Sequence, residues 1–324
     1  MAIALNNSTL VTVFGGSGFV GRYVVQALAK SGCRVRVAVR QPHLANFLQP
    51  LGSVGQIHPV QANLRNDASV RRAVEGADGV VNLVGILQPS GKQTFRSVQA
   101  EGAGLIADAA RDAGVRALVH LSAIGANRSS KSAYGRTKAD GEERVTAAFP
   151  DSVILRPSII FGQEDEFFNR FASMSRFAPL MPLIGGGRTR FQPVYVADVA
   201  QAVLAGLDGR ARSGAPYELG GPAIYSFHEL LDLIADYSER KRPYLPMPFW
   251  AAKLMALFTQ WLPGAPITLD QVRLLQTDNV VSADATAEAR TLAGLAIQPR
   301  AVEAIVPSYL MRFRPKGEFS TNRA

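Results

Sequence analysis

The stretch Gly15-Gly16-Ser17-Gly18-Phe19-Val20-Gly21 decides the fold, because a short apolar strand ends there and a helix begins. Residues 10–14 are β-branched or apolar, and residues 20–30 carry apolar side chains at helical spacing. In such a junction one glycine permits the tight turn, one admits a pyrophosphate to the backbone, and one lets the helix pack on the strand. The amides at the helix N-terminus then face the phosphates. The stretch predicts a dinucleotide-binding loop, with cofactor contacts at Gly15, Ser17, Gly18, Phe19, Val20 and Gly21.

Composition limits the class of protein. The chain has 324 residues, 47% of them hydrophobic, which predicts a large α/β domain and a smaller second one. Its single cysteine, Cys33, excludes an internal disulfide framework. No stretch is apolar for long enough to span a membrane, and the residues before Leu10 show no signal-peptide pattern and leave no room for a transit peptide. We therefore expect a protein of the cytosolic side, bacterial rather than imported.

The chain is strongly basic, with a formal net charge of +9. Its basic residues are scattered rather than gathered in a run or on one helix face, so we expect no nucleic-acid partner. An anionic cofactor, an acidic protein partner or an anionic membrane surface would each match this charge. We predict no metal site.

The end of the second predicted strand, residues 34–40, bears on the choice of cofactor. In NAD-specific sites this position carries Asp or Glu, which binds the 2′-hydroxyl of the ribose. Here it is Arg40, and no Asp or Glu precedes Asp67. A 2′-phosphate would find the guanidinium of Arg40, helped by Arg22 or Arg36, although a solvated basic face would look the same. NADP(H) is therefore the predicted cofactor.

Strands alternate with helices along the first half of the chain. Further strands are predicted over residues 56–60, 80–85 and 117–122, and helices over 67–75 and 93–112. This alternation predicts βαβ units and therefore an α/β fold with a doubly wound parallel sheet of the Rossmann type.

We place the Rossmann domain at residues 1–160 and a smaller C-terminal domain at 161–324. Residues 193–208 are expected to return to the main sheet as a strand and a helix. Ligands bind such sheets at the carboxyl ends of the strands. Further cofactor contacts are expected at Asn63, Leu64, Val84, Gly85, Leu121, Pro157 and Ile160.

Three polar residues could carry chemistry beside that cofactor. Ser122 ends the fifth predicted strand, and Tyr134 and Lys138 stand four residues apart, on one face at the start of a helix. The lysine ammonium would lower the tyrosine pKa and hold a ribose hydroxyl, while the phenol exchanges a proton with a carbonyl or alcohol that the serine holds. A nicotinamide would supply the hydride. The three are the candidate catalytic residues; the alternative is a chance spacing on an ordinary helix.

These motifs resemble the short-chain dehydrogenase/reductase superfamily in its extended form, the branch of nucleotide-sugar epimerases. The stretches that carry this likeness, within residues 10–230, are 155–162, 193–200 and 217–222. Within that superfamily, three stretches resemble the family of the NADPH-binding accessory subunit of respiratory complex I. They are residues 132–142, 157–165 and 266–275.

The resemblance to the accessory-subunit family implies a tightly held, structural NADPH and docking on complex I core subunits near the quinone-reducing arm. It places the protein peripherally on the cytoplasmic side of a bacterial inner membrane, where it could also contact the membrane surface. Relatives are linked to quinone biosynthesis, so the alternative is an NADPH-dependent oxidoreductase or epimerase acting on a carbonyl or alcohol. Ala123 and the lack of an acidic side chain beside Tyr134 argue against dehydratase chemistry. Lys138 would hold a ribose in either case.

Three segments of the C-terminal half are singled out. Residues 164–178 are predicted to form an aromatic-rich helix that packs in a core or, as the alternative, lines a quinone or lipid groove. Residues 249–262 form an almost entirely apolar helix, too short to span a bilayer. It fits an interfacial helix, a helix buried against a partner subunit, or a core helix equally. The basic tail 309–324 is expected to be an exposed end or a strap on a partner.

Overall fold

The computed structural model of the chain describes residues 2–259 and 267–315. The end of the predicted apolar helix and the tail beyond residue 315 lie outside the described residues. The chain divides into two compact units. Unit 1 contains residues 1–157, 196–219 and 282–298, and unit 2 contains residues 158–195, 220–281 and 299–324.

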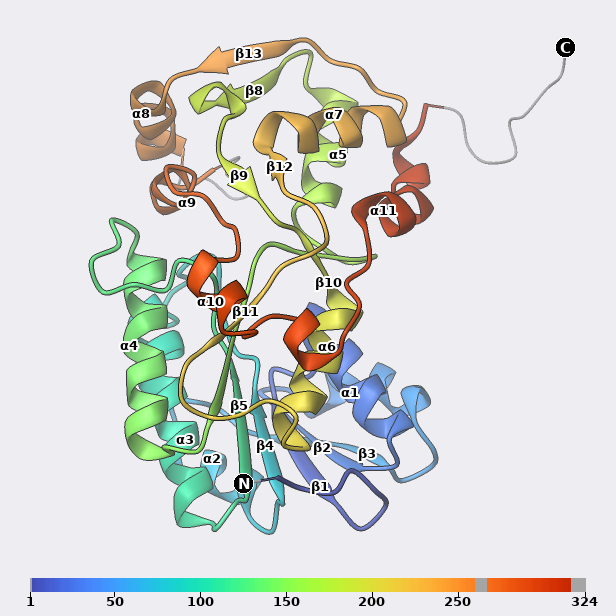
Figure 1. The fold of residues 1–324 in the computed structure, drawn as a ribbon, viewed down its shortest axis with the longest axis vertical. Coiled ribbons are helices and arrows are strands. Elements are labelled where there is room, and N and C mark those ends of the chain that lie inside the picture. Colours follow the sequence, from blue (N-terminus) through green and yellow to red (C-terminus); the bar gives the residue numbers. More distant parts are fainter. Residues whose placement is uncertain (1, 260–266, 316–324) are drawn as a thin grey trace, which may run out of the picture. The chain divides into compact units, whose positions relative to one another are not determined.

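Within the described residues, unit 1 is built on a seven-stranded parallel sheet in the order β11-β6-β5-β4-β1-β2-β3 (Figure 1). Its strands are β1 Leu10–Phe14, β2 Arg34–Val39, β3 Ile57–Gln61, β4 Gly79–Asn82, β5 Ala117–Leu121, β6 Val153–Pro157 and β11 Tyr217–Leu219. The strand order reverses between β1 and β4, and ligands bind at the carboxyl edge of such a switch point. The predicted doubly wound α/β fold is confirmed.

Helices cover both faces of this sheet (Figure 1). On one face α1 Phe19–Lys30 packs against α6 Val196–Leu207. On the other, α3 Gly102–Asp112 packs between α2 Asp67–Val74 and α4 Ala133–Ala148. Two irregular helical segments accompany these helices. The 3-10 helix η1 Pro42–Leu51 packs against α1 and β3, and the π-helix η2 Arg96–Glu101 packs against α4 and leads into α3.

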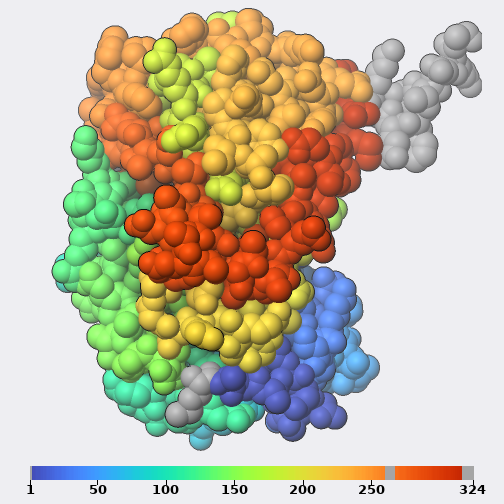
Figure 2. Space-filling model, viewed as in Figure 1, coloured from blue at the N-terminus to red at the C-terminus, as the bar shows by residue number. Residues whose placement is uncertain are grey.

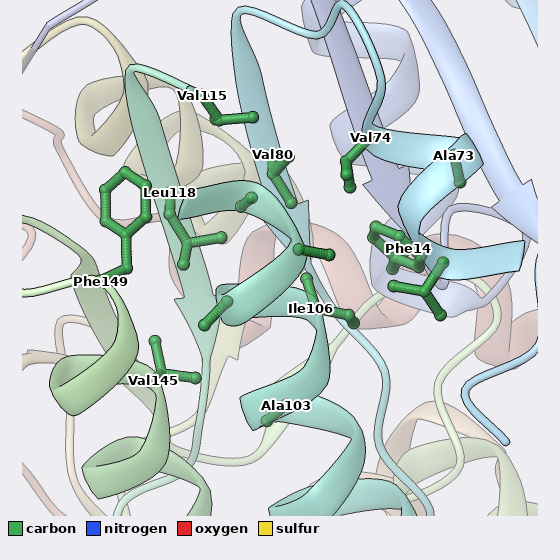
Figure 3. Close-up of a cluster of buried hydrophobic side chains, with 14 of the residues drawn as sticks. Phe14, Ala73, Val74, Val80, Ala103, Ile106, Val115, Leu118, Val145 and Phe149 are labelled. Atoms are coloured by element: carbon green, nitrogen blue, oxygen red, sulfur yellow. The ribbon is translucent and has the colours of Figure 1, made fainter. Parts of the chain in front are cut away.

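One hydrophobic core of unit 1 lies between the sheet and the α2, α3 and α4 layer (Figure 3). Phe14, Val80 and Leu118 project from three neighbouring strands and meet Ile106 of α3 and Val145 of α4. All five side chains are fully or almost fully buried. Burying a side chain of this kind stabilises the fold by about 1.5–3 kcal/mol. The core therefore fixes the strand ends that carry the site.

The return of residues 193–208 differs from the prediction. Helix α6 belongs to unit 1, but β10 Val194–Tyr195 pairs with β7 Ile160–Phe161 in unit 2. The predicted return of a strand to the main sheet at 193–195 is therefore wrong, because the Val194 amide bonds to the carbonyl of Ile159 instead. The strand that extends the sheet comes later, as β11.

Residues 282–298 form a second return to unit 1, which the sequence analysis did not anticipate. This segment contains α10 Ala283–Ala287 and η4 Ala293–Leu295. The amide of Glu218 in β11 donates to the Arg290 carbonyl, and the amide of Ser282 donates to the Glu218 carboxylate at 2.7 Å. In Figure 2 the red-orange surface of the segment borders the yellow surface around β11. The segment thus covers the outer edge of the sheet.

Unit 2 is a smaller body with its own aromatic core. Its helices are α5 Phe168–Phe177, α7 Phe227–Tyr237, α8 Phe249–Thr259, α9 Leu269–Leu274 and α11 Val302–Leu310, with short 3-10 turns η3 Gly185–Gly187 and η5 Met311–Phe313. Its remaining strands pair as β8 Met181–Ile184 with β13 Tyr244–Met247, and β9 Arg190–Phe191 with β12 Tyr225–Ser226. Among the helices of the described ranges, none combines the length and apolar character needed to cross a bilayer.

Helix α5 supplies much of the core of unit 2. Phe168 is fully buried, and Phe167, Phe171 and Met174 pack against the same cluster. The rings of Phe167 and Phe171 meet edge-on, with their centroids 5.1 Å apart, and Phe171 also lies edge-on to Phe227. Phe177, at the end of the helix, is exposed. Core packing therefore accounts for four of the five apolar side chains that mark this helix in the sequence.

Candidate functional site

The glycine loop joins β1 to α1 through a close backbone contact. Gly15 has a φ of +77°, which favours glycine, and a side chain there would crowd the backbone of Leu83 and Val84 at 3.2 Å. A Cβ on Gly21 would lie 2.3 Å from the Gly15 carbonyl oxygen. The N-cap of α1 is Gly18, and no side chain caps it. Because no acidic residue lies in the first turn either, the N-terminus of α1 is open to a pyrophosphate.

The three arginines considered for a 2′-phosphate have different surroundings. Arg40 follows β2 directly and is exposed. Arg36 donates to the carbonyls of Ala73 and Glu75 at 2.8 and 2.7 Å, so its guanidinium binds the C-terminal end of α2. The prediction that Arg36 could help with the phosphate is therefore not supported by its contacts. The guanidinium of Arg22, in the first turn of α1, lies over the Phe47 ring of η1, 5.3 Å from its centroid.

Asn63 and Leu64 form a fixed turn after β3. The Asn63 side-chain carbonyl accepts a hydrogen bond from the Arg65 backbone amide at 3.1 Å, and the Asn63 backbone amide donates to the hydroxyl of Ser69 at 3.0 Å. Leu64 packs on the core cluster beside Gly102, where a Cβ would meet it at 2.8 Å. The two residues thus form a rigid edge beyond β3.

Val84 and Gly85 lie beyond the end of β4, which stops at Asn82 rather than at residue 85 as predicted. The side chain of Asn82 turns the chain, because its carbonyl accepts from the Val84 amide at 3.1 Å. A Cβ on Gly85 would lie 3.5 Å from the Nζ of Lys138. Gly85 therefore brings the loop after β4 next to the predicted lysine.

The structure brings the serine, tyrosine and lysine to the carboxyl end of β5. Ser122 follows that strand directly, and Lys138 donates to the carbonyl of Leu121 at 3.0 Å. The Lys138 Nζ lies 5.9 Å from the centre of the Tyr134 ring. The Ser122 hydroxyl is buried and has no hydrogen-bond partner among the described residues. A buried hydroxyl of this kind is expected to bond to an oxygen of a ligand or of water. The carbonyl or alcohol oxygen of a substrate could be that partner.

The pKa values of the two titratable groups depend on their burial. Burial raises the pKa of Tyr134 to about 12. Burial also lowers the pKa of Lys138 to about 8, against an opposing effect of the Glu142 carboxylate. In the chain alone, burial therefore disfavours the Tyr134 phenolate, and the lowering of its pKa by the lysine ammonium stays a prediction for the site with its cofactor bound.

Gln99 is a residue of this region that the sequence analysis missed. It lies in the π-helix η2 and is 1% exposed. Its side-chain amide donates to the Ile86 carbonyl at 2.8 Å, and its carbonyl accepts from the Thr137 hydroxyl at 2.9 Å. Gln99 thus ties the loop after β4 to the turn of α4 that carries Tyr134. No sequence signal marks Gln99, because neighbours such as Arg96, Ser97 and Glu101 are polar as well.

His120 is a second neighbour of the lysine that the sequence analysis missed. Its Nδ1 lies 3.1 Å from the side-chain amide nitrogen of Asn82. That amide has its oxygen on the Val84 amide, so it donates to His120, and the imidazole proton lies on Nε2. Burial lowers the pKa of His120 to about 3, with a further contribution from the Lys138 charge. The residue is therefore neutral at working pH.

Pro157 and Ile160 fall in different units. Pro157 ends β6, and its carbonyl accepts from the Ile124 amide at 2.9 Å. This bond holds the chain beyond β5 against β6. Ile160 lies in β7 of unit 2. Within residues 2–259 and 267–315, no three His, Cys, Asp or Glu side chains gather in a way that could hold a metal ion.

These features together define a nicotinamide-dinucleotide site of the Rossmann type. The NAD dependent epimerase/dehydratase family model matches residues 11–220, and the chain belongs to this family. The cofactor contacts expected at the glycine loop and beyond β3, β4 and β5 all lie at the carboxyl edge of one sheet.

Individual relatives narrow the comparison. The chain is 35% identical over 320 residues to NADH dehydrogenase (ubiquinone) 1 alpha subcomplex subunit 9, mitochondrial, of Arabidopsis thaliana, covering 95% of this chain and 79% of the relative. It is 31% identical to ceramide reductase of Caulobacter vibrioides, covering 60% of each chain. An NADPH-dependent quinone oxidoreductase from Escherichia coli, solved with NADPH, shares the fold with a TM-score of 0.72 and 18% identity, covering 93% of this chain and 99% of that one.

Proposed function

We propose that this chain is an NADPH-binding accessory subunit of respiratory complex I, with a cofactor that serves as a structural element. The main support is the 35% identity to a subunit of NADH dehydrogenase (ubiquinone), which extends over 95% of the chain. The likeness therefore includes unit 2 as well as the dinucleotide fold that many enzymes share. A fold alone would not support this function.

NADPH is proposed rather than NADH because of the charge around β2. No carboxylate occurs in the first 66 residues, and Arg40 stands exposed where a 2′-phosphate would lie. The pyrophosphate would bind the amides at the open N-terminus of α1, and Lys138 would donate to a ribose hydroxyl. The bound nicotinamide would supply hydride chemistry if the cofactor were turned over. Held without turnover, it would join the glycine loop to α4.

The proposed docking surface of unit 2 is the outer face of α8. Only Ala252 and Ala256 of this helix are fully buried. Four large apolar side chains are exposed on it: Trp250 at 71%, Leu254 at 51%, Leu257 at 49% and Phe258 at 73%. These exposures speak against the core-helix alternative. An exposed apolar face of this size favours contact with a protein partner or with a membrane surface. We propose that it contacts core subunits near the quinone-reducing arm or the membrane itself, on the cytoplasmic side of the inner membrane.

A second function is a freestanding NADPH-dependent reductase that acts on the carbonyl of an apolar substrate. The observation that favours it is the unpartnered, buried hydroxyl of Ser122 beside the Tyr134 and Lys138 pair. The ceramide reductase relative is named for a reduction of this kind. In that reaction Ser122 would hold the substrate oxygen and Tyr134 would donate the proton.

Two variants distinguish these functions in a strain that depends on the protein. Gly18→Asp places a good N-cap on α1, so the fold is retained, while its charge repels the pyrophosphate. Tyr134→Phe keeps the cofactor site and removes the phenol. The accessory-subunit function predicts that Gly18→Asp abolishes complex I assembly or activity and that Tyr134→Phe does not. Loss of function in Tyr134→Phe with intact NADPH binding would instead support the reductase.

A further inference from the structure

Lys138 carries its charge inside the protein. The residue is 4% exposed, and its Nζ donates to the carbonyl of Leu121 at 3.0 Å. A buried ammonium is costly unless an opposite charge lies near it, because its surroundings solvate the charge poorly. A lysine that loses its proton also holds a ribose hydroxyl less strongly, since charged donors form the stronger hydrogen bonds. The source of a compensating negative charge therefore matters for the cofactor.

The titratable groups around Lys138 come from α4 and β5. Tyr134 precedes it by four residues and Glu142 follows it by four, so both lie on its face of α4. His120 of β5 adds an imidazole, whereas η2 contributes Gln99 and the loop after β4 a glycine, neither of which titrates. Burial raises the pKa of the Tyr134 phenol to about 12 and lowers that of the His120 imidazole to about 3, so both are uncharged near neutral pH. Of these described groups, Glu142 alone supplies a negative charge.

A guanidinium holds the Glu142 carboxylate in one position. Arg156 of β6 donates to it at 2.9 and 2.6 Å, and Glu142 is 7% exposed. Arg156 also lies 4.0 Å from the carboxylate of Glu218 in β11, which accepts from the Ser282 amide at 2.7 Å. Because the cluster contains two carboxylates and one guanidinium, the guanidinium does not neutralise it. The cluster therefore presents a fixed negative charge on the Lys138 face of α4.

We propose that Glu142 is a positioning residue for the cofactor, whose fixed carboxylate keeps Lys138 in the ammonium form that binds the ribose hydroxyl. This inference rests on the proposed contact between Lys138 and the ribose. Burial lowers the pKa of Lys138 to about 8, and the Glu142 carboxylate opposes this effect. Without that carboxylate the lysine would lose its proton at lower pH.

The test measures the dissociation constants of NADPH and NADH for the full chain, by fluorescence titration from about pH 6.5 to about pH 9.5. Both cofactors are used, because the ribose hydroxyl that Lys138 would hold occurs in each. Glu142→Gln removes the charge and keeps an acceptor, whereas Glu142→Asp keeps the charge. Asp140→Asn is the matched control, since Asp140 lies on the same helix in an exposed pair with Arg144.

In the wild-type chain both affinities should fall as the pH rises through about 8, where Lys138 loses its proton. Opposite charges four residues apart on an exposed helix correspond to about 0.2–0.4 pH unit, and burial strengthens their attraction. We expect Glu142→Gln to lower the midpoint of the fall by about half a pH unit or more, while Glu142→Asp and Asp140→Asn keep it. A merely structural role would reduce the folded fraction and leave the midpoint in place.

Two results would overturn the inference. An unchanged midpoint in Glu142→Gln would remove the role of Glu142 while the proposed cofactor stood. If the wild-type affinities did not fall near pH 8, the proposed ribose contact of Lys138 would fail, and the inference with it. Should Glu142→Gln not fold, Glu218→Gln removes the other carboxylate of the cluster. It must then lower the midpoint as well, and a wild-type midpoint would count against the inference.

Discussion

Replacing Gly21 by alanine tests how the glycine loop and α1 make the cofactor site. The new Cβ would lie 2.3 Å from the Gly15 carbonyl oxygen and 2.5 Å from the Cα of Gly16. A carbon and a carbonyl oxygen in contact stay about 3.3 Å apart, so α1 must move from the loop by about 1 Å. Overpacking of this kind costs about 1–3 kcal/mol. We expect Gly21→Ala to lower the free energy of unfolding by about 1–3 kcal/mol, measured as a lower midpoint in a urea titration.

The same movement should weaken the cofactor. Displacing the helix N-terminus lengthens its hydrogen bonds to the pyrophosphate, and each bond to a charged group contributes about 1.5–3 kcal/mol. NADPH affinity should therefore fall tenfold or more in a fluorescence titration. Gly18→Ala is the control for stability, because its Cβ would meet only the Gly15 oxygen, at 3.3 Å. Wild-type stability and NADPH affinity in Gly21→Ala would refute this reasoning.

Three further perturbations follow from the structure. Burial lowers the pKa of Lys138 from 10.5 to about 8. Between pH 8 and 10.5 the unfolded chain therefore binds one proton more than the folded chain, so the free energy of unfolding should rise with pH in this range. Urea titrations at several pH values should show this rise in the wild-type chain and its absence in Lys138→Met. Glu142→Ala removes a carboxylate that accepts two hydrogen bonds from the half-buried Arg156 guanidinium. It should lower the free energy of unfolding by about 1.5–3 kcal/mol in the same assay. A wild-type unfolding midpoint would show that this ion pair does not stabilise the fold. Trp250→Ser combined with Phe258→Ser should leave the unfolding midpoint within about 0.5 kcal/mol yet reduce recovery of the chain in washed membranes, and unchanged recovery would exclude this face from docking.

The sheet could be predicted because its signals are local. The glycine loop, the apolar strands and the helical spacing each lie within a dozen residues, and they fix the order of the βαβ units. The pair of Tyr134 and Lys138 could be found for the same reason, because residues four positions apart on a helix lie on the same face. The exposure of α8 was left open in the sequence, because an apolar helix gives no sign of which side is covered.

What could not be predicted depends on contacts distant in the chain. Arg36 binds carbonyls 37 and 39 residues away, so its sequence context gave no hint that it was engaged. Gln99 and His120 enter the site through partners 38 residues away. The Tyr134 pKa depends on burial, which the helical spacing does not reveal. The two-residue strand β10 is too short to carry a pairing preference of its own.

The central claim is that the chain belongs to complex I and carries a bound NADPH. The most direct measurement is to purify complex I from native membranes in mild detergent, then quantify this chain and the nucleotide released on denaturation by mass spectrometry. The account predicts one chain and one NADPH for each complex, with no loss of the nucleotide on washing. Recovery of active complex I without the chain, or of the chain alone with readily exchanging NADP(H), would contradict it.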